Sequence, residues 1–137
     1  MSEEYIVPKD LYYSDSHEWV KIEGDKARIG ITDYAVKQLE EITRLTFEVN
    51  EGDEISQGST IGVVESYKAA EDIYSPLSGK VVEVNREVDE MGEANYSLLT
   101  EDPYGKGWLI VIIPSKLDEE LKKLMKGDEY KEYISKL

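Results

Sequence analysis

The chain has 137 residues, 16 Lys and Arg against 30 Asp and Glu, a formal net charge of −14, and no cysteine. This length is typical of one domain, and the absence of cysteine excludes disulfide scaffolds, thiolate metal sites and cysteine nucleophiles. The negative charge repels phosphate backbones and anionic membrane surfaces, so we expect neither nucleic acid nor membrane as a partner. The N-terminal residues Met-Ser-Glu-Glu lack the features of a signal or transit peptide, which predicts a cytoplasmic protein.

The first predicted elements form a β-hairpin. Residues 18–22 and 27–31 alternate apolar and polar side chains around a Gly-Asp turn signal. A short helix follows over residues 33–39, with Thr32 or Asp33 as its N-cap. The remaining strand-like runs are short and separated by turn residues, which favours a sandwich or barrel of short strands. These runs are 42–49, 59–66, 72–74, 80–84 and 108–113.

The C-terminal residues have helical spacing instead. Ser115 is the predicted N-cap of a first helix and Gly127 its predicted end. Its apolar face consists of Leu117, Leu121, Leu124 and Met125. A second short helix is predicted to place four apolar residues on one side: Tyr130, Tyr133, Ile134 and Leu137. Both stripes are typical of helices that cover a sheet.

A lysine occupies the most conspicuous turn. Two stretches with similar strand and turn chemistry, 50–58 and 76–85, flank a segment that we expect at an exposed turn. In that segment Lys68 has small neighbours, and carboxylates follow or precede it at Glu65, Glu71 and Asp72. A lysine in such a turn is ordinarily a solvated surface residue. An amine at a rigid turn can also be acylated and become the root of a long tether.

The residues around this lysine carry a family resemblance. Glu65-Ser66-Tyr67-Lys68-Ala69-Ala70 and Asp72-Ile73-Tyr74-Ser75-Pro76 resemble the lipoyl-attachment segment of the glycine cleavage system H-protein family. Further motifs follow in the family's order: Ser16-His17-Glu18-Trp19-Val20, Gly30-Ile31-Thr32-Asp33-Tyr34-Ala35, Ser78-Gly79 with Val81-Val82-Glu83-Val84-Asn85, and Glu101-Asp102-Pro103-Tyr104-Gly105-Lys106-Gly107-Trp108.

The resemblance implies a mainly β fold, the hybrid barrel-sandwich of lipoyl and biotinyl carriers. Its short antiparallel strands are accompanied by a short internal helix and C-terminal helices. We therefore expect one lipoyl-carrier domain over residues 1–137. It comprises a β core over 12–114, a lipoyl hairpin around 65–72 and a C-terminal helical cover over 115–137.

The resemblance also implies a carrier that is not itself an enzyme. Lipoate would be joined in amide linkage to Lys68 by a lipoate ligase or transferase, with Glu65 as the acidic residue that the ligase recognises. The swinging arm would take an aminomethyl group from a pyridoxal-phosphate glycine decarboxylase to a folate-dependent aminomethyltransferase. A dihydrolipoyl dehydrogenase would then reoxidise it. A protein that visits several enzymes in turn is expected to be a monomer.

In the family a cleft holds the loaded arm, and the matching residues here are Ser16, Glu18 and Asp72. Two carboxylates and a hydroxyl suit a protonated amine. Each residue also has a purely structural interpretation, with Ser16 and Asp72 capping turns and Glu18 facing outward from a strand. His17 is expected to make a local hydrogen bond at a strand end rather than to act as a base.

Other aromatic and turn residues have structural interpretations. Trp19 and Trp108 are expected in the core, and residues 102–105 form a predicted turn.

Three departures from the family pattern keep an alternative open. Tyr67 replaces the usual valine, residues 39–49 lack the family's glycine and proline and carry Thr43-Arg44, and the approach to the 101–108 motif differs. The alternative is an H-like lipoate-binding protein that carries sulfur intermediates for a heterodisulfide-reductase-like complex. A biotin carrier is disfavoured because methionines do not flank Lys68, and no calcium-loop motif supports an acidic cation-binding module.

Overall fold

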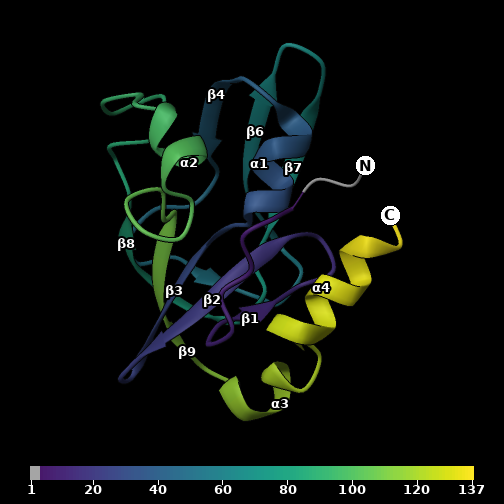
Figure 1. Ribbon diagram of the computed structural model, residues 1–137. Helices are drawn as coiled ribbons and strands as arrows, with labels where there is room; N and C mark the ends of the chain where they lie inside the picture. Colours follow the sequence, from purple (N-terminus) through teal and green to yellow (C-terminus); the bar gives the residue numbers. More distant parts are fainter. Residues whose placement is uncertain (1–3) are drawn as a thin grey trace.

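The computed structural model describes residues 4–137 and contains two antiparallel sheets (Figure 1). The larger sheet has the strand order β10-β1-β2-β3-β9-β8-β5. Its strands are β1 (Tyr12–Tyr13), β2 (Glu18–Glu23), β3 (Lys26–Ile31), β5 (Glu54–Ile55), β8 (Gly79–Val84), β9 (Ile110–Pro114) and β10 (Met125–Lys126). The smaller sheet has the order β4-β6-β7, with strands β4 (Ile42–Phe47), β6 (Thr60–Ser66) and β7 (Ala70–Tyr74).

Four short helices accompany the sheets in the part of the chain that the structure describes. They are α1 (Asp33–Leu39), α2 (Ser97–Glu101), α3 (Leu117–Leu121) and α4 (Gly127–Ser135). The helix α2 was not among the predicted elements. None of these helices is long and apolar enough to cross a membrane.

The main core lies between the two sheets. Apolar side chains of both contribute to one cluster whose members are almost fully excluded from solvent, including Val20, Ile29, Leu45, Ile61, Ile73, Val81 and Ile112. Burying a side chain of this size stabilises the fold by about 1.5 to 3 kcal/mol. The mainly β fold predicted from the short alternating runs is confirmed.

The predicted hairpin and first helix are confirmed as well. Glu23 pairs with Lys26, and Gly24 occupies the first loop position with a φ of +64°, which glycine adopts without steric cost. Thr32 caps α1, since its hydroxyl accepts a hydrogen bond of 3.2 Å from the backbone N–H of Ala35.

The prediction for residues 115–127 is wrong in four respects. The first helix, α3, has Lys116 rather than Ser115 as its N-cap. It already ends at Leu121 instead of continuing to Gly127. Met125–Lys126 form β10, which pairs with β1, so the C-terminal cover contains a strand. Gly127 begins α4 instead of ending a helix. Pairing with Tyr12–Tyr13 forces the chain to be extended where the local pattern favoured a helix.

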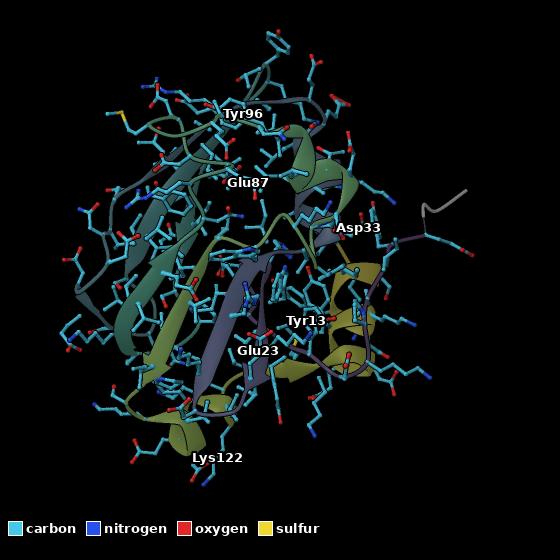
Figure 2. The ribbon with its side chains drawn as sticks, turned by 90° about the vertical axis from the view of Figure 1, so that its left-hand side faces the viewer. Tyr13, Glu23, Asp33, Glu87, Tyr96 and Lys122 are labelled. Carbon is cyan, nitrogen blue, oxygen red and sulfur yellow. The ribbon has the colours of Figure 1, made fainter. Side chains whose placement is uncertain are left out.

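A second apolar cluster joins α4 to the strands. Tyr130 lies stacked on Tyr13 with ring centroids 4.6 Å apart, and Figure 2 shows Tyr13 between the strands and the C-terminal helix. Ile134 is also buried here, while Leu137, predicted on the same face, is exposed. The prediction that the second helix packs against the sheet is therefore confirmed for the first two turns of α4.

The two tryptophans differ in burial. Trp19 is fully buried in the second cluster, and its indole N–H donates to the carbonyl of Pro103 at 3.0 Å. Gly30 lies beneath its ring so closely that a Cβ there would be 2.5 Å from the indole. Trp108 is only partly buried and lies under the Arg28 guanidinium, 4.7 Å from the ring centroid.

Candidate functional site

The β6–β7 hairpin presents Lys68 at its tip, as predicted. The backbone N–H of Ser66 donates to the carbonyl of Ala69 at 2.8 Å and closes the turn. The Ser66 hydroxyl accepts from the backbone N–H groups of Lys68 and Ala69 at 3.3 and 3.2 Å. These bonds hold the turn backbone, so the lysine stands on a defined base while its side chain remains 54% exposed.

A cleft of about 460 Å³ opens beside this hairpin. Its lining comes from β2 and the turn before it, from α1 and from the hairpin itself, and includes Ser16, Glu18, Lys68 and Asp72. The structure thus brings four of the predicted site residues to one cavity. Ser16 and Glu18 lie just before and at the start of β2 of the larger sheet. Lys68 and Asp72 lie on the β6–β7 hairpin of the smaller sheet. Glu65, the fifth, is not part of this lining.

Glu18 is the buried charge of the cleft. Its side chain is not the outward-facing strand residue of the structural interpretation, since only 1% of the residue is exposed. One carboxylate oxygen accepts from the hydroxyls of Ser14 and Ser16, both at 2.5 Å. The other carboxylate oxygen accepts a hydrogen bond of 3.1 Å from the backbone N–H of Tyr74, which belongs to β7 of the smaller sheet.

The environment of Glu18 sets its protonation. Burial raises the pKa of this carboxyl to about 7, because an apolar surrounding disfavours the charged form. The hydrogen bonds from Ser14, Ser16 and Tyr74 act in the opposite direction and limit the rise. A carboxyl that titrates near neutral pH can hold a proton or bind a cation in the same place.

Ser16 and Asp72 complete the polar lining in different ways. Ser16 lies in the turn before β2, and its hydroxyl donates to the Glu18 carboxylate. It is therefore both a turn residue and a cleft residue. Asp72 lies within β7, opposite Val63, and not at a turn. It is exposed and accepts a long bond of 3.5 Å from the Tyr74 hydroxyl.

Ser14 was missed by the sequence analysis. Its hydroxyl donates to the Glu18 carboxylate and also accepts from the Glu18 backbone N–H at 2.9 Å. The signal that could have found it is the second serine two residues before Ser16, at a position where the chain turns into β2.

His17 makes a long-range contact instead of the expected local one. Its Nδ1 lies 2.8 Å from the hydroxyl of Tyr130 in α4, and that hydroxyl lies 2.8 Å from the Thr32 hydroxyl. Its backbone φ is +74°. Burial lowers the pKa of the imidazole, so the neutral form predominates at pH 7. This chain of contacts ties the cleft wall to the C-terminal helix.

Glu65 faces β4, the strand that departs from the family pattern. Arg44 pairs with it across the strands, its Nη1 lying 3.6 Å from the carboxylate, and its Nε contacts Glu90 at 2.8 Å. The register shifts between Ile42 and Arg44, so the exposed Thr43 bulges from the ladder. Despite the bulge, the apolar face of β4 still meets the core through Leu45.

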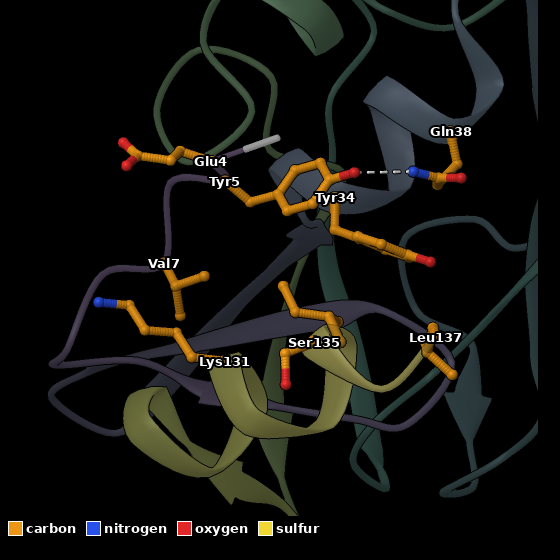
Figure 3. Close-up of a pocket in the computed structure, with 9 residues that line it drawn as sticks. Glu4, Tyr5, Val7, Tyr34, Gln38, Lys131, Ser135 and Leu137 are labelled. Carbon is orange, nitrogen blue, oxygen red and sulfur yellow. Dashed lines mark hydrogen bonds between the residues drawn. The ribbon is translucent and has the colours of Figure 1, made fainter. Parts of the chain in front are cut away.

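A second hollow, of about 680 Å³, lies between the N-terminal segment, α1 and α4 (Figure 3). The Gln38 amide donates to the Tyr5 hydroxyl at 3.0 Å across it. Tyr34 and Gln38 line both hollows, but neither Lys68 nor Glu18 reaches this one. Among residues 4–137 no group of three or more His, Asp and Glu side chains is arranged to hold a metal ion. The predicted site residues Ser16, Glu18, Lys68 and Asp72 all line the cleft of about 460 Å³.

Comparison with known proteins identifies the family. Residues 11–137 match the model of the family described as glycine cleavage H-protein. The chain belongs to this H-protein family.

Individual H proteins agree over nearly the whole length. The glycine cleavage system H protein of Carboxydothermus hydrogenoformans is 50% identical over 129 residues, covering 94% of this chain and 95% of the relative. That of Bacillus subtilis is 46% identical over 127 residues, covering 92% and 94%. A crystal structure of a glycine cleavage system H protein from Mycobacterium marinum superposes with a TM-score of 0.79 at 33% identity, covering 90% of this chain and 95% of that one. The predicted resemblance and fold class are confirmed.

Proposed function

We propose that this protein is a lipoyl carrier of the glycine cleavage system, with lipoate attached in amide linkage to Lys68. The observation that carries the proposal is the position of Lys68, exposed on a hydrogen-bonded hairpin tip at the rim of a cleft with a buried carboxyl. An acyl chain on Nζ has solvent on one side and a cavity of about 460 Å³ on the other. The residues present therefore fit a long, flexible acyl group.

The cleft residues suit a cationic cargo. Lipoate supplies two sulfur atoms that can carry an aminomethyl group. A protonated amine at the end of such an arm would meet Glu18, held in place by Ser14 and Ser16, with Asp72 nearer the solvent. In a partly dry site, charge-assisted hydrogen bonds are stronger than in water. The cleft walls would also keep water from a labile cargo.

In the proposed carrier role, partner enzymes catalyse the chemical steps and this chain brings the cargo to them. The partners in the proposal are the pyridoxal-phosphate glycine decarboxylase, the folate-dependent aminomethyltransferase, the dihydrolipoyl dehydrogenase, and a lipoate ligase or transferase that recognises Glu65. A tether raises the effective concentration of the cargo at each of them. The proposal includes a cytoplasmic monomer that forms one lipoyl-carrier domain over residues 1–137 and catalyses no step itself.

The sulfur-carrier alternative has less support. Its basis was the unusual segment 39–49, yet the bulge at Thr43 leaves β4 paired with β6. The relatives described above are named as glycine cleavage system H proteins. The family comparison thus does not favour the alternative.

Intact-mass measurement after coexpression with a lipoate ligase tests the attachment. We expect one lipoyl increment on the wild-type chain, its loss in Lys68→Arg, and its retention in Lys80→Arg, which alters an exposed lysine on β8. An unmodified wild-type chain or a biotinyl increment would contradict the proposal.

A glycine–bicarbonate exchange assay with the decarboxylase from the same source then tests the cargo, and no exchange by fully lipoylated protein would favour the sulfur-carrier alternative.

A further inference from the structure

Glu40 has a backbone conformation that is unusual for glutamate. It follows α1 with φ +68° and ψ −119°, the angles of the first central residue of a type II′ turn, where glycine is the normal residue. Its side chain is 71% exposed, so burial does not compensate for the strained backbone. Strained residues persist at positions where the surrounding structure or a function retains them.

The Glu40 carboxylate is directed at the hairpin tip. Its Oε2 lies 3.8 Å from Nζ of Lys68, which brings the end of α1 and the β6–β7 turn together. The adjacent Glu41 is also exposed and forms no ion pair with any residue from 4 to 137. The strained residue, and not its neighbour, is therefore the one that meets the lysine.

A second ion pair joins the same segment to the hairpin. Four residues further on, Arg44 lies opposite Glu65 on β6 and pairs with its carboxylate. The segment 40–44 thus sets a carboxylate against the hairpin lysine and a guanidinium against the hairpin glutamate. Charges matched in this order favour one position of the hairpin relative to α1 and β4.

We propose that Glu40 is a positioning residue for unmodified Lys68, whose ion pair must open before the lysine is acylated and cannot re-form afterwards. The inference rests on the proposed attachment of an acyl group to Lys68. It makes the end of α1 a latch that holds the free amine and releases the acylated arm.

The chemistry of acylation explains the one-way release. The ammonium of Lys68 gives up a proton, its nitrogen attacks the carbonyl carbon of an activated acyl donor such as the mixed anhydride of an acyl-adenylate, and the N–C bond forms. The C–O bond to the leaving group breaks, its electron pair departs with the nucleotide phosphate, and the nitrogen loses a second proton to water. The resulting amide is neutral, so the charge that attracted Glu40 is gone.

Chemical acylation of the full-length, unmodified chain tests the latch without a ligase. An acetyl N-hydroxysuccinimide ester is the probe, and peptide mass spectrometry follows its reaction at Lys68 against Lys80 as an internal reference. We expect Glu40→Gln to raise the rate at Lys68 by about two- to fivefold, the range of an exposed ion pair. Glu41→Gln, the matched control, should leave the rate unchanged. The gain should vanish at high ionic strength, where exposed charges are screened.

Two further variants separate the outcomes. Glu40→Gly also removes the carboxylate, relieves the backbone strain, and should match Glu40→Gln in rate. Equal rates in Glu40→Gln and Glu41→Gln would overturn the latch, and so would a slower Glu40→Gln, since the carboxylate would then assist loss of the proton. If ligase-treated wild-type protein stays unmodified, the proposed function fails. If it is lipoylated while the chemical rates are equal, only the latch fails.

Discussion

Replacing Glu18 by glutamine removes the buried titratable group of the cleft while preserving its shape. The two N–H groups of an amide can donate to the Ser14 and Ser16 hydroxyls, and its oxygen can accept from the Tyr74 N–H. We expect the variant to fold normally and to differ from the wild type in the pH dependence of its stability.

The magnitude follows from the two pKa values. The Glu18 carboxyl titrates at its ordinary value of 4.5 in the unfolded chain and at about 7 in the folded protein. Between these values the folded state binds more protons, so the free energy of unfolding decreases as pH rises. The difference corresponds to about 3 kcal/mol, lost between about pH 4.5 and about pH 7 and constant above. In Glu18→Gln this loss is absent.

Urea unfolding at a series of pH values, followed by the fluorescence of Trp19 and Trp108, measures the effect. The free energy of unfolding of Glu18→Gln minus that of the wild type should increase by about 3 kcal/mol from about pH 4.5 to about pH 8. Asp15 and Asp72 line the same cleft and are present in both proteins, so the comparison changes Glu18 alone. Glu83→Gln, at an exposed position on β8, should show no such trend. A pH-independent difference for Glu18→Gln would refute the reasoning.

Three other predictions concern packing, hydrogen bonding and charge. Gly30→Ala would place a methyl group 2.5 Å from the Trp19 ring and should cost about 1 to 3 kcal/mol in urea unfolding; an unchanged midpoint would contradict this close contact. Tyr130→Phe removes the hydroxyl between His17 and Thr32 and should lower stability by about 1 to 3 kcal/mol, whereas a neutral effect would show that these groups are otherwise satisfied. With a net charge of −14, the protein should bind the proposed partner enzymes more weakly as salt is added, and an affinity independent of ionic strength, measured by calorimetry, would exclude electrostatic docking.

Local signals made part of the fold predictable. The hairpin of β2 and β3 depends on alternation and on Gly24, and α1 depends on the Thr32 cap, all within a few residues of one another. The C-terminal segment was mispredicted around Gly127 because the glycine signal for a helix end is also local. Pairing of Lys126 with Tyr12 comes from the other end of the chain, and no short pattern encodes it.

The site, like the fold, could be predicted only in part from local sequence signals. The exposed turn around Lys68 was predictable from the strand-like runs on either side. Burial of Glu18 was not, because alternation along β2 implies one exposed face, whereas Glu18, Trp19 and Val20 are all buried where both faces of the strand are covered. The contact of Lys68 with Glu40 depends on where α1 ends relative to a hairpin from the other sheet.

The hydrogen bond from the Tyr74 N–H to Glu18 connects the two sheets at the floor of the cleft. In the proposed function, a proton and a cationic cargo would compete for the same carboxylate, and each would displace the other. Binding of an ammonium group at Glu18 would thus stabilise the whole protein above neutral pH, where the proton has been lost. Under the proposed function, cargo binding and the stability of the contact between the two sheets would therefore be coupled through Glu18.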